Sequence, residues 1–228
     1  MKTKLFTIAI TFLATLVMTN RAQAFIVINE ILADPPAGVF GDANGDGVTS
    51  SSQDEFVELL NTGNSAINLS GWYLADAVST RHIFSPATSI LEHGFLVIFG
   101  GGTPSLPGIQ TQAASTGLLS LNNAGDQVIL FDDAGVIASQ LIYGSEGGKD
   151  QSLTRFPEGS GSDFVLHTSL EQAQGKKFSP GTTIDGQTQL QVSPVSDQAT
   201  VPEPSSLMLL GLGLASLWLR RRNREQKM

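Results

Sequence analysis

Short oxygen-bearing side chains alternate along the segment Gly41–Gly47, and this spacing is typical of a calcium-binding loop. Asp42, Asn44 and Asp46 occupy every second position, so their side chains can converge on one point, as in the opening of an EF-hand loop. Val48 stands at the seventh position, where such loops use a backbone carbonyl. The sequence therefore predicts calcium as the cofactor.

The acidic residue that closes a complete loop is displaced. Counting from Asp42, the twelfth residue is Gln53, and Asp54 and Glu55 follow it. We expect a β-strand after the loop, so the helical register need not hold and Asp54 or Glu55 could close the site. The alternative is a surface loop rich in Asx turns that holds no metal, because Asp, Asn and Gly favour turns unaided.

Two further carboxylates lie on predicted strands. Glu58 stands between Val57 and Leu59, so we expect it to be partly buried and to need a partner. Arg155 is the expected partner, which makes the pair structural. The alternative is a small secreted hydrolase acting on glycans, in which Glu58 and Glu30 form the pair of carboxylates that cleaves a glycosidic bond.

Other catalytic motifs are missing from the sequence. It contains no Gly-x-Ser-x-Gly elbow, no His-Glu-x-x-His motif and no cysteine. Trp72 follows a glycine on a predicted strand, and we expect its ring to fill the core, the alternative being a ring that stacks on a ligand. The sequence thus predicts no catalytic residue.

Charge is distributed unevenly along the 228 residues. The chain as a whole has a formal net charge of −8, but between Phe25 and Pro204 five basic residues face twenty acidic ones. Such an acidic body is repelled by a phosphate backbone, so nucleic acid is not an expected partner. With 41% hydrophobic residues, the chain can bury a core and is too apolar to be wholly disordered.

The first 24 residues have the pattern of a signal peptide. Lys2 and Lys4 precede the apolar stretch Leu5–Met18, and Ala22 and Ala24 flank the small-x-small site that a signal peptidase accepts. Cleavage after Ala24 makes the protein an exported one. The alternative is an uncleaved membrane anchor.

The C-terminus combines three sorting features. A Pro-Glu-Pro motif precedes an apolar stretch, which an arginine cluster ends; its residues are Pro202, Glu203, Pro204, Arg220, Arg221 and Arg222. The arginines should stay cytoplasmic, which leaves the preceding chain outside. Ser205–Leu219 reaches only about 22 Å as a helix, short of a hydrocarbon core of about 30 Å, so as a permanent anchor it is marginal.

This C-terminal segment resembles the PEP-CTERM sorting signal of Gram-negative bacteria. The resemblance implies that an exosortase recognises Pro202, Glu203 and Pro204 and removes the tail. It also implies a membrane-anchored precursor and a final location at the cell surface or in an extracellular polysaccharide matrix. The alternative is a plain membrane anchor with a chance Pro-Glu-Pro.

Between the two terminal segments the hydrophobic pattern predicts an all-β domain. The segment Asp132–Gly135 is typical of a tight hairpin connection between its neighbouring strands. The predicted strands, which Gly, Asn, Asp and Pro clusters separate, are Phe25–Leu32, Asp54–Leu60, Gly71–Leu74, His82–Phe84, Phe95–Phe99, Leu118–Leu121, Gln127–Phe131, Val136–Tyr143, Ser152–Phe156 and Phe164–His167.

The same middle region resembles a lamin tail domain, an immunoglobulin-like β-sandwich. The blocks that carry the resemblance, in order, are Val27–Leu32, Asp54–Asn61, Leu69–Asp76, Leu121–Asp126 and Ser152–Arg155. The resemblance implies a non-catalytic binding or structural role. Since such domains also accompany secreted enzymes, a second alternative is an accessory module of a secreted phosphoesterase.

The predicted organisation has four parts: a signal peptide (1–24), a lamin-tail-like β-sandwich (25–181), a flexible linker (182–201) and a sorting signal with a transmembrane helix (202–228). During export the expected partners are signal peptidase, exosortase and, through the C-terminal helix, the membrane. In the mature state they are extracellular polysaccharide or other surface proteins.

Overall fold

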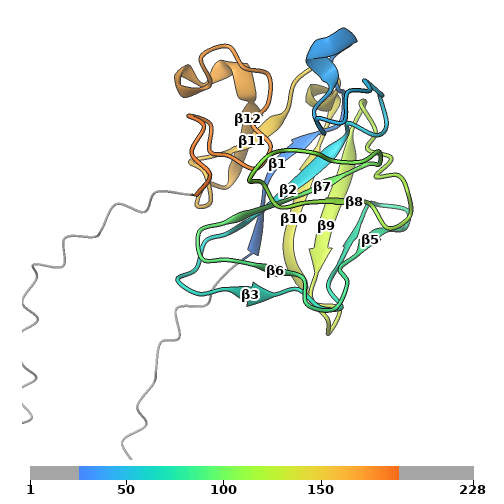
Figure 1. Cartoon of the computed structure of the whole chain (residues 1–228), viewed down its shortest axis with the longest axis vertical. Coiled ribbons are helices and arrows are strands. Elements are labelled where there is room, and N and C mark those ends of the chain that lie inside the picture. Colours follow the sequence, from blue (N-terminus) through green and yellow to red (C-terminus); the bar gives the residue numbers. More distant parts are fainter. Residues whose placement is uncertain (1–25, 190–228) are drawn as a thin grey trace, which may run out of the picture. The chain divides into compact units, whose positions relative to one another are not determined.

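The computed structural model describes residues 26–189; the predicted signal peptide and sorting signal lie outside this range. The described chain is built of strands joined by turns and short 3₁₀ helices (Figure 1). The strands are β1 (Ile26–Leu32), β2 (Phe56–Asn61), β3 (Ile67–Asn68), β4 (Tyr73–Ala75), β5 (Thr80–Ile83), β6 (Ser89–Ile90), β7 (Phe95–Phe99), β8 (Thr111–Ala113), β9 (Asp126–Phe131), β10 (Ile137–Tyr143), β11 (Leu153–Phe156) and β12 (Asp163–Leu166). The 3₁₀ helices are η1 (Gly38–Gly41), η2 (Ser145–Gly147), η3 (His167–Ser169) and η4 (Glu171–Ala173).

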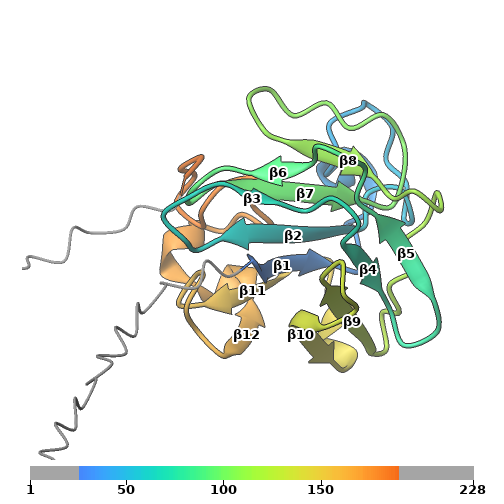
Figure 2. The ribbon, with the colours of Figure 1, turned by 90° about the horizontal axis from the view of Figure 1, so that it is seen from below.

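The strands form two main sheets and one short two-stranded sheet. The larger sheet has the order β12-β11-β1-β2-β7-β8, with only the β7–β8 pair parallel, and the smaller has the order β10-β9-β4-β5 (Figure 2). Strands β3 and β6 pair separately. Apolar side chains from both main sheets pack into one core, which identifies the fold as a β-sandwich.

The central strands of the larger sheet are buried on both faces. Along β2, Val57 and Leu59 point into the core between the sheets, whereas Phe56 on the opposite face packs with Val97 and Phe99. This second face is covered by loops, whose apolar contacts include Leu106, Ile109 and Phe178. Every residue of β2 and β7 is therefore buried, and a polar side chain on β2 must find its partners inside the protein.

The predicted all-β immunoglobulin-like sandwich is confirmed. The hairpin at Asp132–Gly135 also forms, and β9 pairs with β10 in antiparallel register. The Asp132 carboxylate accepts the N–H groups of Ala134 and Val136, and Gly135 has a positive φ of 77°. These are the roles that Asp and Gly play in tight turns.

Two local predictions are wrong. Leu118–Leu121 forms no strand, because Ser120 has a φ of +55° and the Leu121 N–H is bonded to a carboxylate instead of a neighbouring strand. Trp72 is only half-buried just before β4 and packs against the edge of the core. The fully buried aromatic ring near it is that of Phe84.

The folded body extends past the predicted boundary at residue 181. We call residues 175–187 the C-terminal strap; it follows η4 and lies beside β11 and β12 (orange in Figure 1). Within it Ser179, Thr183 and Ile184 are buried. The first residues of the predicted linker thus belong to the sandwich, and the rest of that linker lies outside the described residues.

Residues 26–189 contain no helix that is both long and apolar enough to cross a membrane.

Candidate functional site

Within the acidic loop, residues 41–55, hydrogen bonds to backbone N–H groups link four of the predicted ligand residues, Asn44, Asp46, Val48 and Asp54. Asn44 Oδ1 accepts the Asp46 N–H at 2.9 Å, and Asp46 in turn accepts the N–H groups of Val48 at 2.9 Å and Thr103 at 3.0 Å. These backbone donors hold the pKa of Asp46 below its ordinary value, because they stabilise the charged form. The Val48 side chain is exposed.

Asp54 fastens the end of this loop to its beginning. Its two carboxylate oxygens accept the N–H groups of Asn44 at 3.0 Å and Ser50 at 2.7 Å. Burial raises the pKa of Asp54, and the nearby charge of Asp42 raises it further. The loop is thus closed by hydrogen bonds of its own.

One carboxylate oxygen in the acidic loop lacks a partner. Asp42 Oδ2 accepts the Gly47 N–H at 3.0 Å, whereas Oδ1 is buried and accepts no hydrogen bond. In residues 26–189 no group of three or more His, Cys, Asp or Glu side chains is arranged to hold a metal ion. Any cation in this loop would rely on backbone carbonyls or water as well as carboxylates.

Glu55 turns away from the acidic loop. Its carboxylate accepts the Leu121 N–H at 3.2 Å, and the charges that act on it come from Arg81 and Asp126. Burial raises the pKa of Glu55 to about 7. In this arrangement Glu55 supports the irregular segment before β9 instead of closing the loop with Asp54.

Glu30 and Glu58 form a buried pair between the two central strands. They are direct cross-strand neighbours in the β1–β2 register, and neither is exposed to solvent. A β-bulge at Asn29 shifts the register, and the Asn29 amide donates to Glu58 Oε1 at 2.9 Å. Burial and the neighbouring charge of Glu30 hold the pKa of Glu58 well above its ordinary value.

The C-terminal strap supplies the remaining donors. Gly181 N–H donates to Glu58 Oε2 at 2.7 Å, and Ser179 donates its N–H and its hydroxyl to the two oxygens of Glu30 at 2.9 and 2.7 Å. Gly181 has a φ of +77°, and a Cβ there would overlap Ile109. Glycine is therefore required at this position for the strap to pass Ile109 while its N–H donates to Glu58.

The predicted pairing of Glu58 with Arg155 is wrong. Arg155 Nε donates to the Ile28 carbonyl at 2.8 Å, Nη1 donates to the Gly161 carbonyl, and the guanidinium lies over the Phe164 ring. Arg155 is thus structural, but through backbone carbonyls on other elements. Glu58 is satisfied by an amide and a backbone N–H instead of by a cation.

A third carboxylate, Glu158, extends this cluster. It accepts the Ile184 N–H at 3.2 Å and lies 3.4 Å from the Asn29 amide nitrogen that also binds Glu58. Burial raises its pKa to about 7. We call Glu30, Glu58 and Glu158 the carboxylate cluster; Asn29 and the strap connect its members.

This geometry gives no support to glycoside hydrolysis by Glu30 and Glu58. A glycosidase needs its two carboxylates to face each other across an open cleft, whereas here the protein's own chain covers both. Sequence reasoning also missed Asn29, Ser179 and Gly181 as partners. The one available signal was the placement of two glutamates on strands with no cation nearby in sequence.

Two regions of the chain match models of known protein families. The family model of the Lamin Tail Domain matches residues 19–145, and that of the PEP-CTERM protein-sorting motif matches residues 200–223. The first match ends before β11, so β11, β12 and the strap lie beyond it. The sorting motif lies outside the described residues. No curated protein shows significant similarity to the chain.

The pKa values of Glu55 and Glu158 predict how the stability depends on pH. Both groups have a pKa of about 7 in the folded protein against 4.5 in the unfolded chain, so the folded state binds more protons between these values. The contribution of these two groups to the free energy of unfolding should therefore fall as the pH rises from 4.5 to 7, against an opposite contribution from His82 and His167, whose pKa values burial lowers. Urea unfolding of the full chain at several pH values measures this slope.

In that experiment the Glu55→Gln, Glu158→Gln double variant should show a smaller slope than the parent chain. The exposed Glu92→Gln is the matched control and should leave the slope as it is. A double variant whose stability changes with pH just as that of the parent chain does would contradict the assignment of the raised pKa values.

Proposed function

We propose, given that the chain belongs to the lamin tail domain family, that it acts as a non-catalytic binding or structural module at the cell surface or in an extracellular polysaccharide matrix. The family consists of immunoglobulin-like domains without catalysis. The PEP-CTERM motif implies an exported, membrane-anchored precursor that is processed by an exosortase.

The observation that carries this proposal is the order of the parts along the chain. A sandwich stabilised without a disulfide stands before a sorting motif, and the motif is followed by an apolar stretch and an arginine cluster. Removal of the tail would release the sandwich from the membrane. The mature protein would then act through its surface, in contact with extracellular polysaccharide or other surface proteins.

Calcium binding in the acidic loop is a second proposal. Its support is the buried Asp42 Oδ1, which accepts no hydrogen bond, together with the repulsion between Asp42 and Asp54. A cation near Asp42 would compensate both. Extracellular calcium modules bind with dissociation constants of about 10⁻⁴ to 10⁻³ M, so millimolar calcium would occupy such a site.

Export and processing predict the mass of the mature protein. Protein recovered from the outer surface should lack residues 1–24 and the segment from about Ser205 onward, and intact mass spectrometry measures both ends. In cells without exosortase, the C-terminal segment should be retained and the protein should stay in the membrane fraction. Recovery of the complete C-terminus from the outer surface of normal cells would refute the processing.

The proposed calcium site predicts that the thermal stability depends on calcium. At a hundred times the dissociation constant, calcium would stabilise the folded chain by about 2.7 kcal/mol, because the unfolded loop does not bind. The melting temperature of the full chain should therefore rise with calcium and fall with chelator. Asp42→Asn should abolish this response, whereas Asp133→Asn in the exposed hairpin turn should leave it intact. Identical melting of the parent chain in calcium and in chelator would eliminate the site.

A further inference from the structure

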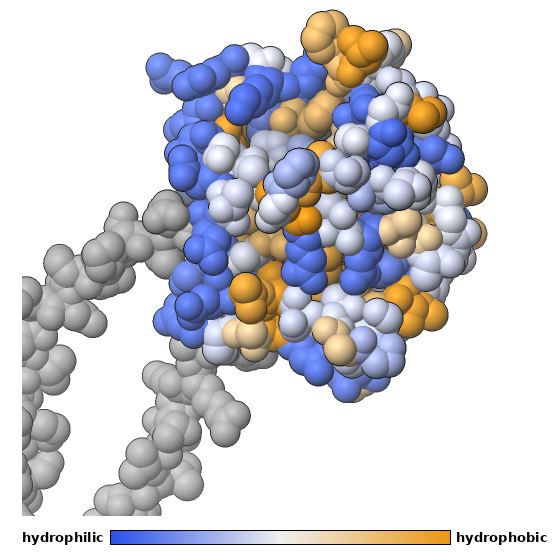
Figure 3. Space-filling view, in the orientation of Figure 1, coloured by the Kyte–Doolittle hydropathy of each residue, from blue (hydrophilic) through white to orange (hydrophobic). Residues whose placement is uncertain are grey.

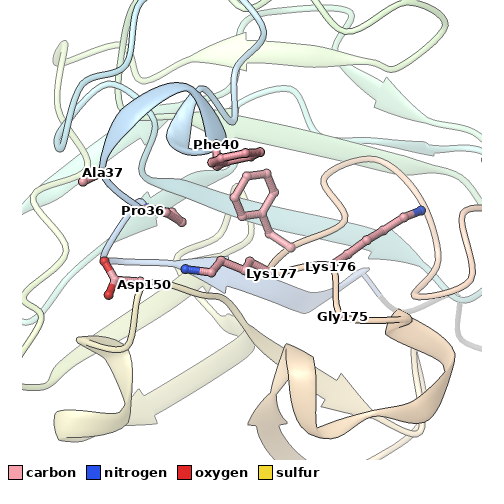
Figure 4. Close-up of a pocket in the computed structure, with 8 residues that line it drawn as sticks. Pro36, Ala37, Phe40, Asp150, Gly175, Lys176 and Lys177 are labelled. Carbon is pink, nitrogen blue, oxygen red and sulfur yellow. The ribbon is translucent and has the colours of Figure 1, made fainter.

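A pocket of about 590 Å³ opens between η1, the loop after η2 and the strap. Its lining includes Phe40 from η1, Asp150 from the loop, and Lys177 and Phe178 from the strap (Figure 4). Ligand pockets of proteins commonly measure about 300–1,000 Å³ and combine apolar walls with a few polar groups. The pocket fits that description. None of its lining residues belongs to the acidic loop or to the carboxylate cluster.

The aromatic wall of the pocket is held out into solvent by the local backbone. Val39 and Phe40 of η1 are 83% and 80% exposed. A hydrophobic patch stands out at the top of the molecule in Figure 3, on the side where Figure 1 shows the blue η1 segment. Gly41 lets η1 fold back on Pro36, because a Cβ at Gly41 would overlap the Pro36 carbonyl oxygen. Val39 and Phe40 together present adjacent exposed apolar side chains on a fixed turn, and contiguous exposed apolar surface commonly marks a binding site.

The opposite wall of the pocket is fixed to the core. The Phe178 ring packs edge-on against the fully buried Phe56, with their centroids 6.3 Å apart. The next residue, Ser179, is bonded to Glu30. The strap therefore holds Lys177 and Phe178 in place on the pocket wall, so little ordering is needed on binding.

Positive charge is concentrated around this pocket. Residues 26–189 contain 18 acidic and only five basic residues. Of the five, Arg81 pairs with Asp76, and Arg155 is engaged with backbone carbonyls and a ring. The other three are Lys149, next to the lining residue Asp150, and Lys176 and Lys177 in the strap.

The two lysines of the strap that line the pocket extend in different directions. In Figure 4 the Lys177 ammonium extends toward the side where Asp150 lies, below Phe40, whereas Lys176 extends the opposite way. Among the described residues none of the three lysines forms an ion pair. The Lys177 ammonium is thus free to donate to an anion, and the Asp150 carboxylate can accept from a hydroxyl group.

We propose that this pocket binds an acidic saccharide, a segment of polysaccharide with a carboxylate on its sugar rings. The aromatic ring of Phe40 offers a flat face for the C–H groups of a sugar, Lys177 pairs with the carboxylate, and Asp150 accepts a hydroxyl proton. A uronic acid presents all three features on one ring. This inference rests on the proposed surface function and specifies the ligand class for it.

A concave pocket with a carboxylate in its wall favours a discrete saccharide over a lipid surface. A bilayer that received Phe40 would also bring Asp150 toward its anionic headgroups, and the acidic body as a whole would be repelled. The saccharide instead uses Asp150 as an acceptor. Anionic lipid vesicles therefore serve as the contrasting probe in the test.

Isothermal titration calorimetry of the full chain in detergent with a galacturonic acid hexamer tests the proposal. Binding should be measurable, should weaken with added salt because it is partly ionic, and should be stronger than binding of the neutral maltohexaose. Phe40→Ala and Lys177→Gln should each weaken it about tenfold. Because both residues are exposed, these variants should fold normally, which urea unfolding checks.

Matched controls are available beside each residue. Val39→Ala removes an equally exposed apolar side chain from the same turn, and Lys149→Gln removes a lysine that does not line the pocket; each should change the affinity by less than about threefold. No binding of the hexamer, equal binding of maltohexaose, or binding only to anionic lipid vesicles would overturn the proposal. Since the assay uses purified protein, these results are independent of whether the chain is exported and processed.

Discussion

The burial of Glu30 and Glu58 side by side on the central strands is the constraint on which the remaining architecture depends. Two carboxylates removed from water destabilise a fold unless donors surround them. The bulge at Asn29 provides one donor, and the strap provides the N–H groups of Ser179 and Gly181 and the Ser179 hydroxyl. The chain beyond the family match is therefore an integral part of this sandwich.

That constraint also links the interior to the surface. Because the strap must reach Glu30 and Glu58, its preceding residues cross the edge of the second apolar face, where Phe178 packs against Phe56. Lys177 is thereby placed opposite η1. The pocket is thus a consequence of how the buried carboxylates are satisfied. The proposed saccharide site and the stability of the fold share one structural element.

The sequence predicted features that depend on local pattern and missed those that depend on distant contacts. Alternating hydrophobicity located most strands, and Asp132 and Gly135 located a hairpin, because both signals lie within a few residues. The burial of Glu58 followed from its neighbours in β2. Its partner did not, since the donor at Gly181 is 123 residues away and is a backbone N–H group, which every residue type except proline carries. The predicted burial of the Trp72 ring was wrong for a similar reason, because the residues that pack around a strand end come from the other sheet.

Hydrogen exchange of the strap amides shows whether the buried carboxylates hold the strap in the core. If Ser179 and Gly181 donate to buried carboxylates, their N–H groups should open only with the whole domain and exchange as slowly as those of β2. Amide-resolved exchange of the full chain, measured by NMR or by mass spectrometry with fragmentation, gives these rates. We expect protection close to that of the core at both positions. Exchange as fast as that of an exposed turn would contradict it.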